Sequence, residues 1–175
     1  SLSLSIHALF GTALVFHIVS IFDEVGKGRA EAFSYFIPAA IFSTLSNLFA
    51  SWVSDKINLK PILIAMLFSF CLGSFGFIYL INSWGFWLLA FGFGVGGGLW
   101  GVISNLTFIR FFGPKHLGEI SGLSASLNVV GSAIGPAAFS LGFDFFGSYG
   151  APAKICLALI IILLLVAIFL KQKEE

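Results

Sequence analysis

Residues 61–109, between Lys60 and Arg110, carry no charged side chain. A helix needs about 20 apolar residues to cross the hydrocarbon core of a bilayer. This stretch is therefore long enough for two crossings, with a tight turn expected at Asn82 and Ser83. The elements of a soluble domain are shorter and have one polar face, so a soluble domain cannot bury so long an apolar run. We expect the chain to span a membrane.

The overall composition supports this expectation. The chain is 58% hydrophobic and 10% charged, with a mean hydropathy of +1.04, whereas soluble domains average roughly 25% charged residues. The net charge is +1, and the sequence has no basic face with which to bind nucleic acid. Cys71 and Cys156 both lie in apolar runs, where free thiols behave as small hydrophobic groups.

The first residues, Ser1-Leu-Ser-Leu-Ser, contain neither an initiator methionine nor the positive segment of a signal peptide. We therefore expect the chain to be part of a longer one.

Uncharged runs bounded by charge, glycine or proline predict six transmembrane helices. Each span must be helical, because lipid cannot satisfy the polar groups of irregular backbone. The predicted spans are residues 2–22, 32–53, 61–81, 84–109, 117–143 and 152–170. The expected fold class is an all-α membrane protein, with residues 1–175 forming a single six-helix bundle.

Lysine and arginine in short loops set the orientation of membrane helices. One side of the predicted bundle carries Lys56, Lys60, Arg110, Lys115, Lys171 and Lys173. The other side carries Lys27, Arg29 and Lys154. This asymmetry predicts that both ends lie in the cytoplasm, in a plasma membrane such as the bacterial inner membrane.

Polar side chains gather on the first, second, fourth and fifth spans, whereas the third and sixth look lipid-facing. Polar stripes within a bilayer face other helices or a wet cavity. Two interpretations stay open for the serines and asparagines, namely hydrogen bonds between helices and a solute path. The candidates for that path are His7, His17, Asn47, Trp100, Ser104, Asn105 and Asn128.

The two histidines are ten residues apart, which is roughly 15 Å along a helix, so they cannot share one ligand. A lone histidine is also more often a hydrogen-bonded structural residue than a proton relay.

Glycine and proline give the fourth and fifth spans close-packing or deformable segments. Gly94 and Gly98 form a small-xxx-small pair, and Gly131 is followed by Gly135 and Pro136. Such glycines let another backbone approach closely, and proline removes a hydrogen bond and kinks a helix. Static packing and movement between two shapes both remain open.

The loop after the second span resembles the cytoplasmic signature of the major facilitator superfamily. The match falls on Asp55, Lys56 and Lys60, and the sequence departs from the signature at Ser51, Asn58 and Leu59. A longer match runs from Phe111-Phe-Gly-Pro-Lys115 through Gly135-Pro136 to Tyr149. It resembles the monocarboxylate-porter and oxalate/formate-antiporter branch, as does Phe16-His17. The resemblance covers the whole chain and corresponds to the C-terminal half of a twelve-helix protein.

The resemblance implies secondary active transport, by symport or antiport, of a small solute such as an organic acid or monocarboxylate. In such proteins two halves rock about a midplane site. The first and fourth spans would line the path, and the second and fifth would meet the N-terminal half. Asp55 would pair with the start of the fifth span, Arg110 or Lys115 as a cytoplasmic gate, together with Lys56 and Lys60. A solvated Asp55, and lysines that serve only as positive-inside anchors, are the simpler alternatives.

Other functions have weaker support. Gly118-Glu-Ile-Ser121-Gly122 is the nearest approach to a hydrolase turn, but it lies at a helix start. No carboxylate cluster suits a metal, so we expect no enzymatic activity, no cofactor and no metal. A self-sufficient six-helix protein that dimerises into a channel or half-transporter is the remaining alternative.

Overall fold

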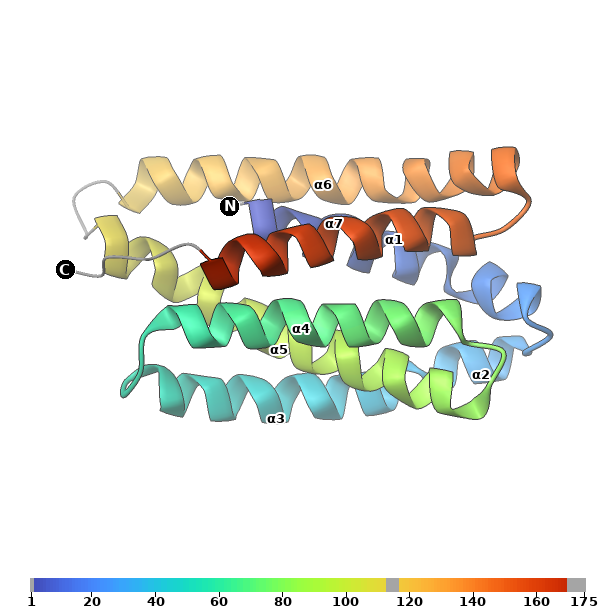
Figure 1. Cartoon of the computed structure of the whole chain (residues 1–175), viewed down its shortest axis with the longest axis horizontal. Helices are drawn as coiled ribbons and strands as arrows, with labels where there is room; N and C mark the ends of the chain where they lie inside the picture. Colours follow the sequence, from blue (N-terminus) through green and yellow to red (C-terminus); the bar gives the residue numbers. More distant parts are fainter. Residues whose placement is uncertain (1, 113–116, 170–175) are drawn as a thin grey trace.

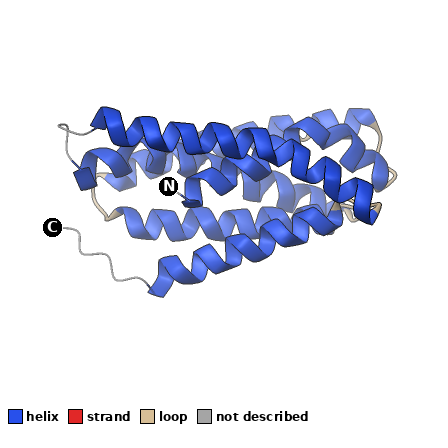
Figure 2. Cartoon of the chain, turned by 90° about the horizontal axis from the view of Figure 1, so that it is seen from above, coloured by secondary structure: helices blue, strands red, loops and turns tan. Residues whose placement is uncertain are grey.

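The computed structural model describes residues 2–112 and 117–169, and every regular element in these residues is a helix (Figures 1 and 2). The helices are α1 (Leu2–Glu24), α2 (Arg29–Ser34), α3 (Phe36–Ser54), α4 (Leu59–Ile78), α5 (Ser83–Phe112), α6 (Leu117–Phe146) and α7 (Gly150–Phe169). Because α2 and α3 form one span, six stretches of the described chain are long and apolar enough to cross a bilayer. The predicted all-α fold with six spans is confirmed.

The span boundaries differ from the predictions by at most three residues, and two of these differences have a clear structural cause. The third span ends at Ile78 rather than at residue 81, because the chain turns where the Asn82 N–H donates to the Tyr79 carbonyl (3.1 Å). The second span begins earlier, with α2, and is interrupted at Tyr35. Pro38 has no N–H to donate to the Ser34 carbonyl, which accounts for this interruption.

The helices lie side by side, with α3 and α6 on opposite sides of the bundle (Figure 1). Between them, α4 and α5 lie towards α3, and α1 and α7 lie towards α6. We call the end of the bundle where α1 begins and α7 ends the terminal end. The α3–α4 connection lies at this end, and the α1–α2, α4–α5 and α6–α7 connections lie at the opposite end.

Glycines bring α5 into backbone contact with α4. A Cβ atom added to Gly92 would lie 2.6 Å from the Ser69 carbonyl oxygen and would overlap the backbone of Gly73. Gly76 is in turn placed against the backbone of Leu89. Small residues allow this close approach of membrane helices, where packing replaces the hydrophobic effect.

A second row of glycines on α5 faces α3. A Cβ on Gly94 would lie 2.7 Å from the Ala39 carbonyl oxygen, and Gly98 lies against the backbone of Ser43. The Asn47 Nδ2 donates to the Gly98 carbonyl (3.0 Å), and the Ser46 hydroxyl donates to the Val95 carbonyl (3.3 Å). Glycine contacts and hydrogen bonds thus join α3 to α5.

The α1–α6 pair is packed in the same way. Gly131 approaches the Ser5 carbonyl, and Gly135 lies against the backbone of Leu9. Aromatic rings then connect this pair to α4 and α5, because the Phe10 ring lies 5.8 Å from Phe77 on α4 and 4.9 Å from Phe93 on α5. The close backbone contacts therefore lie within two groups of helices, and side chains fill the space between the groups.

Within this chain α3 and α6 have few buried residues. In the most apolar windows, 6% of the Arg29–Ser54 span and 11% of the Gly118–Phe146 span is buried, against 56% of Ser83–Arg110. Their exposed faces carry large apolar side chains, including Ile37, Leu45, Phe49, Leu123, Val130 and Leu141. Both faces are open to lipid or to a further bundle.

The packing predicts that a glycine-to-alanine substitution changes stability at one position of α5 and not at another. Gly92→Ala should lower the free energy of unfolding by about 1–3 kcal/mol, because its methyl group would meet backbone that cannot move aside. Gly97→Ala should be neutral, since the nearest atoms to its Cβ would lie 3.9 Å away. Thermal unfolding of the complete protein in detergent measures both. Equal destabilisation by the two variants would contradict the close α4–α5 contact.

Candidate functional site

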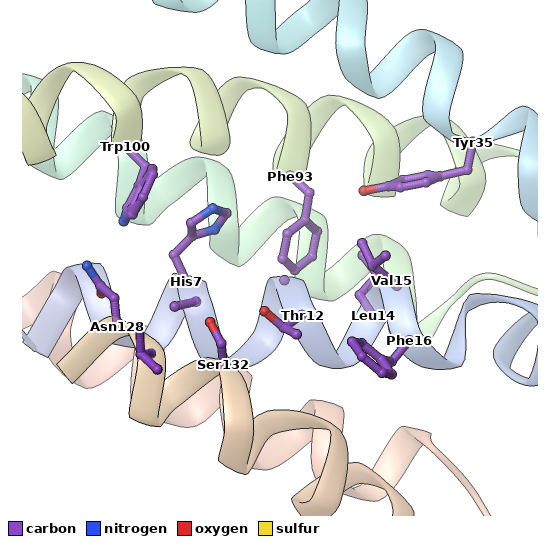
Figure 3. A pocket seen from close by; sticks show the side chains of 13 residues that line it. His7, Thr12, Leu14, Val15, Phe16, Tyr35, Phe93, Trp100, Asn128 and Ser132 are labelled. Atoms are coloured by element: carbon purple, nitrogen blue, oxygen red, sulfur yellow. The ribbon is translucent and has the colours of Figure 1, made fainter. Parts of the chain in front are cut away.

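The main cavity lies where α1, α5 and α6 meet, and its volume is about 580 Å³. Side chains from all three helices and Tyr35, at the α2–α3 junction, surround it (Figure 3). Three of the predicted path residues line it together, namely His7, Trp100 and Asn128. In the described chain, no lysine, arginine, aspartate or glutamate lines this cavity.

Aromatic contacts position His7. Its ring stacks on Phe70 with the centroids 4.6 Å apart, and it lies 5.1 Å from the Trp100 ring at a tilt of 47°. Trp100 is itself anchored, because its Nε1–H donates to the Leu4 carbonyl (3.2 Å). The imidazole is therefore held by its faces, which leaves the Nδ1 atom without a hydrogen-bond partner.

Asn128 comes from α6 on the other side of α1 and lies at the same end of the cavity as His7 and Trp100 (Figure 3). Its Oδ1 is buried and also has no partner. The residues that line the cavity thus combine aromatic surface with two buried polar atoms that have no hydrogen-bond partner.

A second cavity, of about 370 Å³, lies between α3 and α5 near the terminal end. Asn47, Asn105 and Asp55 line it, together with Ser51 and Ser54. Asn47 is occupied by its hydrogen bond to Gly98, whereas Asn105 is exposed. These two asparagines therefore lie apart from His7 and Asn128. Ser104 lines neither cavity, and its hydroxyl donates to the Gly101 carbonyl (3.0 Å).

His17 belongs to a separate polar cluster near the opposite end. Its Nε2 lies 3.1 Å from the Pro136 carbonyl oxygen, and its Nδ1 lies 3.4 Å from the Tyr149 hydroxyl. Glu24, at the end of α1, accepts hydrogen bonds from the Ser148 hydroxyl (2.5 Å) and the Tyr149 N–H (3.0 Å). The cluster joins α1 to α6 and to the start of α7, where a carboxylate is favoured by the helix dipole.

The predicted gate residues make contacts other than the expected ion pair. Arg110 donates to the carbonyls of Ser54 and Ile57, so it neutralises the C-terminal end of α3. Asp55 forms no ion pair with Arg110 in the described part of the chain. Asp55 also lies away from the start of α6 in this structure, because α3 and α6 are on opposite sides of the bundle.

The two lysines of the gate prediction also have partners near the terminal end. The Lys60 ammonium donates to the Ile168 carbonyl near the end of α7 (3.0 Å), and Lys56 lies over the Trp52 ring at 3.9 Å. Lys115 lies outside the described residues.

Several residues around these sites were not among the predicted path residues. Thr12 and Ser132 line the main cavity, and Ser132 lies one turn from Asn128 on the polar stripe that the sequence displays. Tyr35 and Phe93 also line it, but no local pattern distinguishes these aromatic side chains from others. Glu24 resembles an ordinary loop acid until α7 is placed beside it.

A family model described as the Major Facilitator Superfamily matches residues 2–175. No curated protein and no solved structure matches the chain. The family match covers all the helices that form the two cavities.

The polar cluster predicts a stability difference between neighbouring acids. Glu24→Ala should lower the free energy of unfolding by about 1 kcal/mol, because the start of α7 loses the acceptor of two hydrogen bonds. Asp23→Ala is the matched control, since the exposed Asp23 carboxylate has no hydrogen bond in the described residues. Thermal unfolding in detergent measures both variants. A Glu24→Ala protein as stable as the Asp23→Ala protein would show that Glu24 does not hold α7.

Proposed function

Since the chain belongs to the Major Facilitator Superfamily, we propose that it forms the C-terminal one of two six-helix bundles in a secondary active transporter that works by alternating access. Family membership supports the transport of a solute across the membrane, and a transporter rather than an enzyme. The chain is an integral multi-pass membrane protein, and lipid surrounds part of its surface.

The observation that carries the proposal is the main cavity between α1, α5 and α6. Transporters of this architecture bind solute near the bilayer midplane, where two repeats meet. Unpartnered polar side chains inside apolar spans, such as His7 and Asn128 in this cavity, are costly unless they bind something. The exposed apolar faces of α3 and α6 flank the bundle on either side and fit an N-terminal six-helix half of the same protein.

The solute is proposed to be a small organic acid such as a monocarboxylate, carried by symport or antiport. The support is the similarity of residues 111–149 and of Phe16-His17 to monocarboxylate porters and oxalate/formate antiporters. The proposed orientation places the terminal end in the cytoplasm of a bacterial-type plasma membrane. Lys56, Lys60 and Arg110 all lie near that end, as the distribution of positive charge requires.

Asp55 is proposed to act in the cytoplasmic gate through the other half of the transporter. Its side chain is exposed at the end of α3, where the helix dipole disfavours a carboxylate. A positive helix start or a basic side chain on the N-terminal half would relieve that cost when the gate closes. Arg110 would support the gate by holding the last turn of α3 in place.

Labelling of single cysteines in the complete protein tests alternating access. In a background from which every native cysteine, Cys71 and Cys156 included, has been removed, Asn128→Cys should react with a membrane-impermeant thiol reagent from both sides of a vesicle, because the cavity opens to each side in turn. Phe68→Cys is the control, since Phe68 is 54% exposed on the outer face of α4 and a thiol in lipid stays unreactive. Adding Asp55→Asn should raise labelling from the cytoplasmic side severalfold, whereas Asp23→Asn should not.

Labelling of Asn128→Cys from neither side would refute the proposed path. If Asn128→Cys is labelled from both sides in a dimer of this chain without another half, the dimeric channel or half-transporter is favoured. An Asp55→Asn variant that labels like its parent would refute the gate while leaving the path intact.

A further inference from the structure

Two buried polar atoms without partners belong to residues that line the same cavity. They are the His7 Nδ1 and the Asn128 Oδ1. Buried polar groups are almost always hydrogen-bonded, and each unpaired one costs free energy. The two residues come from different helices, α1 and α6, and lie at one end of the cavity beside Trp100 (Figure 3). A ligand group that contacts both residues would remove both costs.

Together, His7 Nδ1 and Asn128 Oδ1 can form hydrogen bonds with one donor and one acceptor of a ligand. The Asn128 carbonyl oxygen accepts a hydrogen bond and cannot donate one. The His7 Nδ1 donates or accepts according to its tautomer, and the stacking of its ring on Phe70 does not use that atom. A head group with adjacent donor and acceptor atoms would satisfy both residues at once.

Within this bundle, the lining of the cavity disfavours a charged head group. The residues that line the cavity in the described chain contain no cation to pair with a carboxylate and no anion to pair with an ammonium. Taking an unpaired charge into such a site is far more costly than burying a neutral polar group that is hydrogen-bonded.

The rest of the wall suits an apolar or aromatic body. Leu14, Val15, Phe16 and Phe93 line the side away from Asn128, and the volume of about 580 Å³ lies in the range of small-molecule sites. The rings of Trp100 and Phe93 offer faces and edges to a planar ligand.

We propose that the cavity binds an uncharged head group, either a primary amide or a protonated carboxylic acid, between Asn128 Oδ1 and His7 Nδ1, with an apolar body along Phe93 and Val15. The donor of the head group binds Asn128 and its carbonyl oxygen accepts from His7. The inference rests on the proposed function, because it takes this cavity as part of the solute path. An organic acid would then enter this bundle together with its proton.

Three probes of similar size, each with one phenyl ring and a different head-group charge, test the charge preference. Benzamide, benzoate and benzylammonium are titrated at pH 7.5 against the complete purified protein, and binding is followed by calorimetry and by the shift in melting temperature. Benzamide should bind at least about tenfold more tightly than either ion. Lowering the pH until benzoate is protonated should bring its affinity to within about threefold of benzamide measured at that pH.

Substitutions at Asn128 test whether the preference for an uncharged head group depends on its side chain. Asn128→Leu should weaken benzamide about tenfold or more, because one hydrogen bond is lost. Asn128→Asp, which keeps the shape, should reverse the preference in favour of benzylammonium. Ser126→Ala is the control on the same helix, since its hydroxyl donates to the Gly122 carbonyl and lies outside the cavity.

Tighter binding of either ion than of benzamide would overturn the proposal, and so would the absence of binding by all three probes. Benzamide binding that survives in both Asn128 variants would place the ligand elsewhere. The experiments distinguish a wrong head-group proposal from a wrong transport proposal. If Asn128→Cys is labelled from both sides while the probes prefer an ion, the path stands and only the neutral head group is wrong.

Discussion

The backbone contact between α5 and its two neighbours is the constraint on which the rest of the bundle depends. Membrane helices gain no hydrophobic free energy by leaving lipid for one another, so close packing must hold them together. Gly92 lets α4 approach one face of α5, and Gly94 and Gly98 let α3 approach another. Larger side chains at these positions would separate the three helices and move every residue that α5 contributes to the main cavity.

The cavity is a consequence of this uneven packing. The α1–α6 pair has its own glycine contacts, and only side chains such as Phe10 and Phe93 bridge it to α5. A boundary filled by side chains can separate or repack with less disturbance than one in which backbones touch. The cavity with His7 and Asn128 lies on this boundary, which is where a moving transporter would be expected to open.

The sequence was sufficient for the parts that depend on hydropathy along one helix. Uncharged runs predicted six spans, and Asn82 did mark a turn, although α4 ends earlier than expected. The sequence was insufficient where a partner belongs to another helix, because helix rotation and pairing are not visible in a linear pattern. Arg110 caps the end of α3, and His17 bonds Pro136 instead of lining the cavity. The branch of the family and the solute stay predictions.

The central claim is that water, rather than lipid, reaches the side chains between α1, α5 and α6 in the working protein. Fluorescence of Trp100 measures this directly in the complete protein after every other tryptophan, Trp52, Trp84 and Trp87 included, has been replaced by phenylalanine. The account predicts that acrylamide in the aqueous phase quenches Trp100 and that phospholipids brominated on their acyl chains do not. Quenching by brominated lipid with no effect of acrylamide would contradict it, because the ring would then face the bilayer and not a solute path.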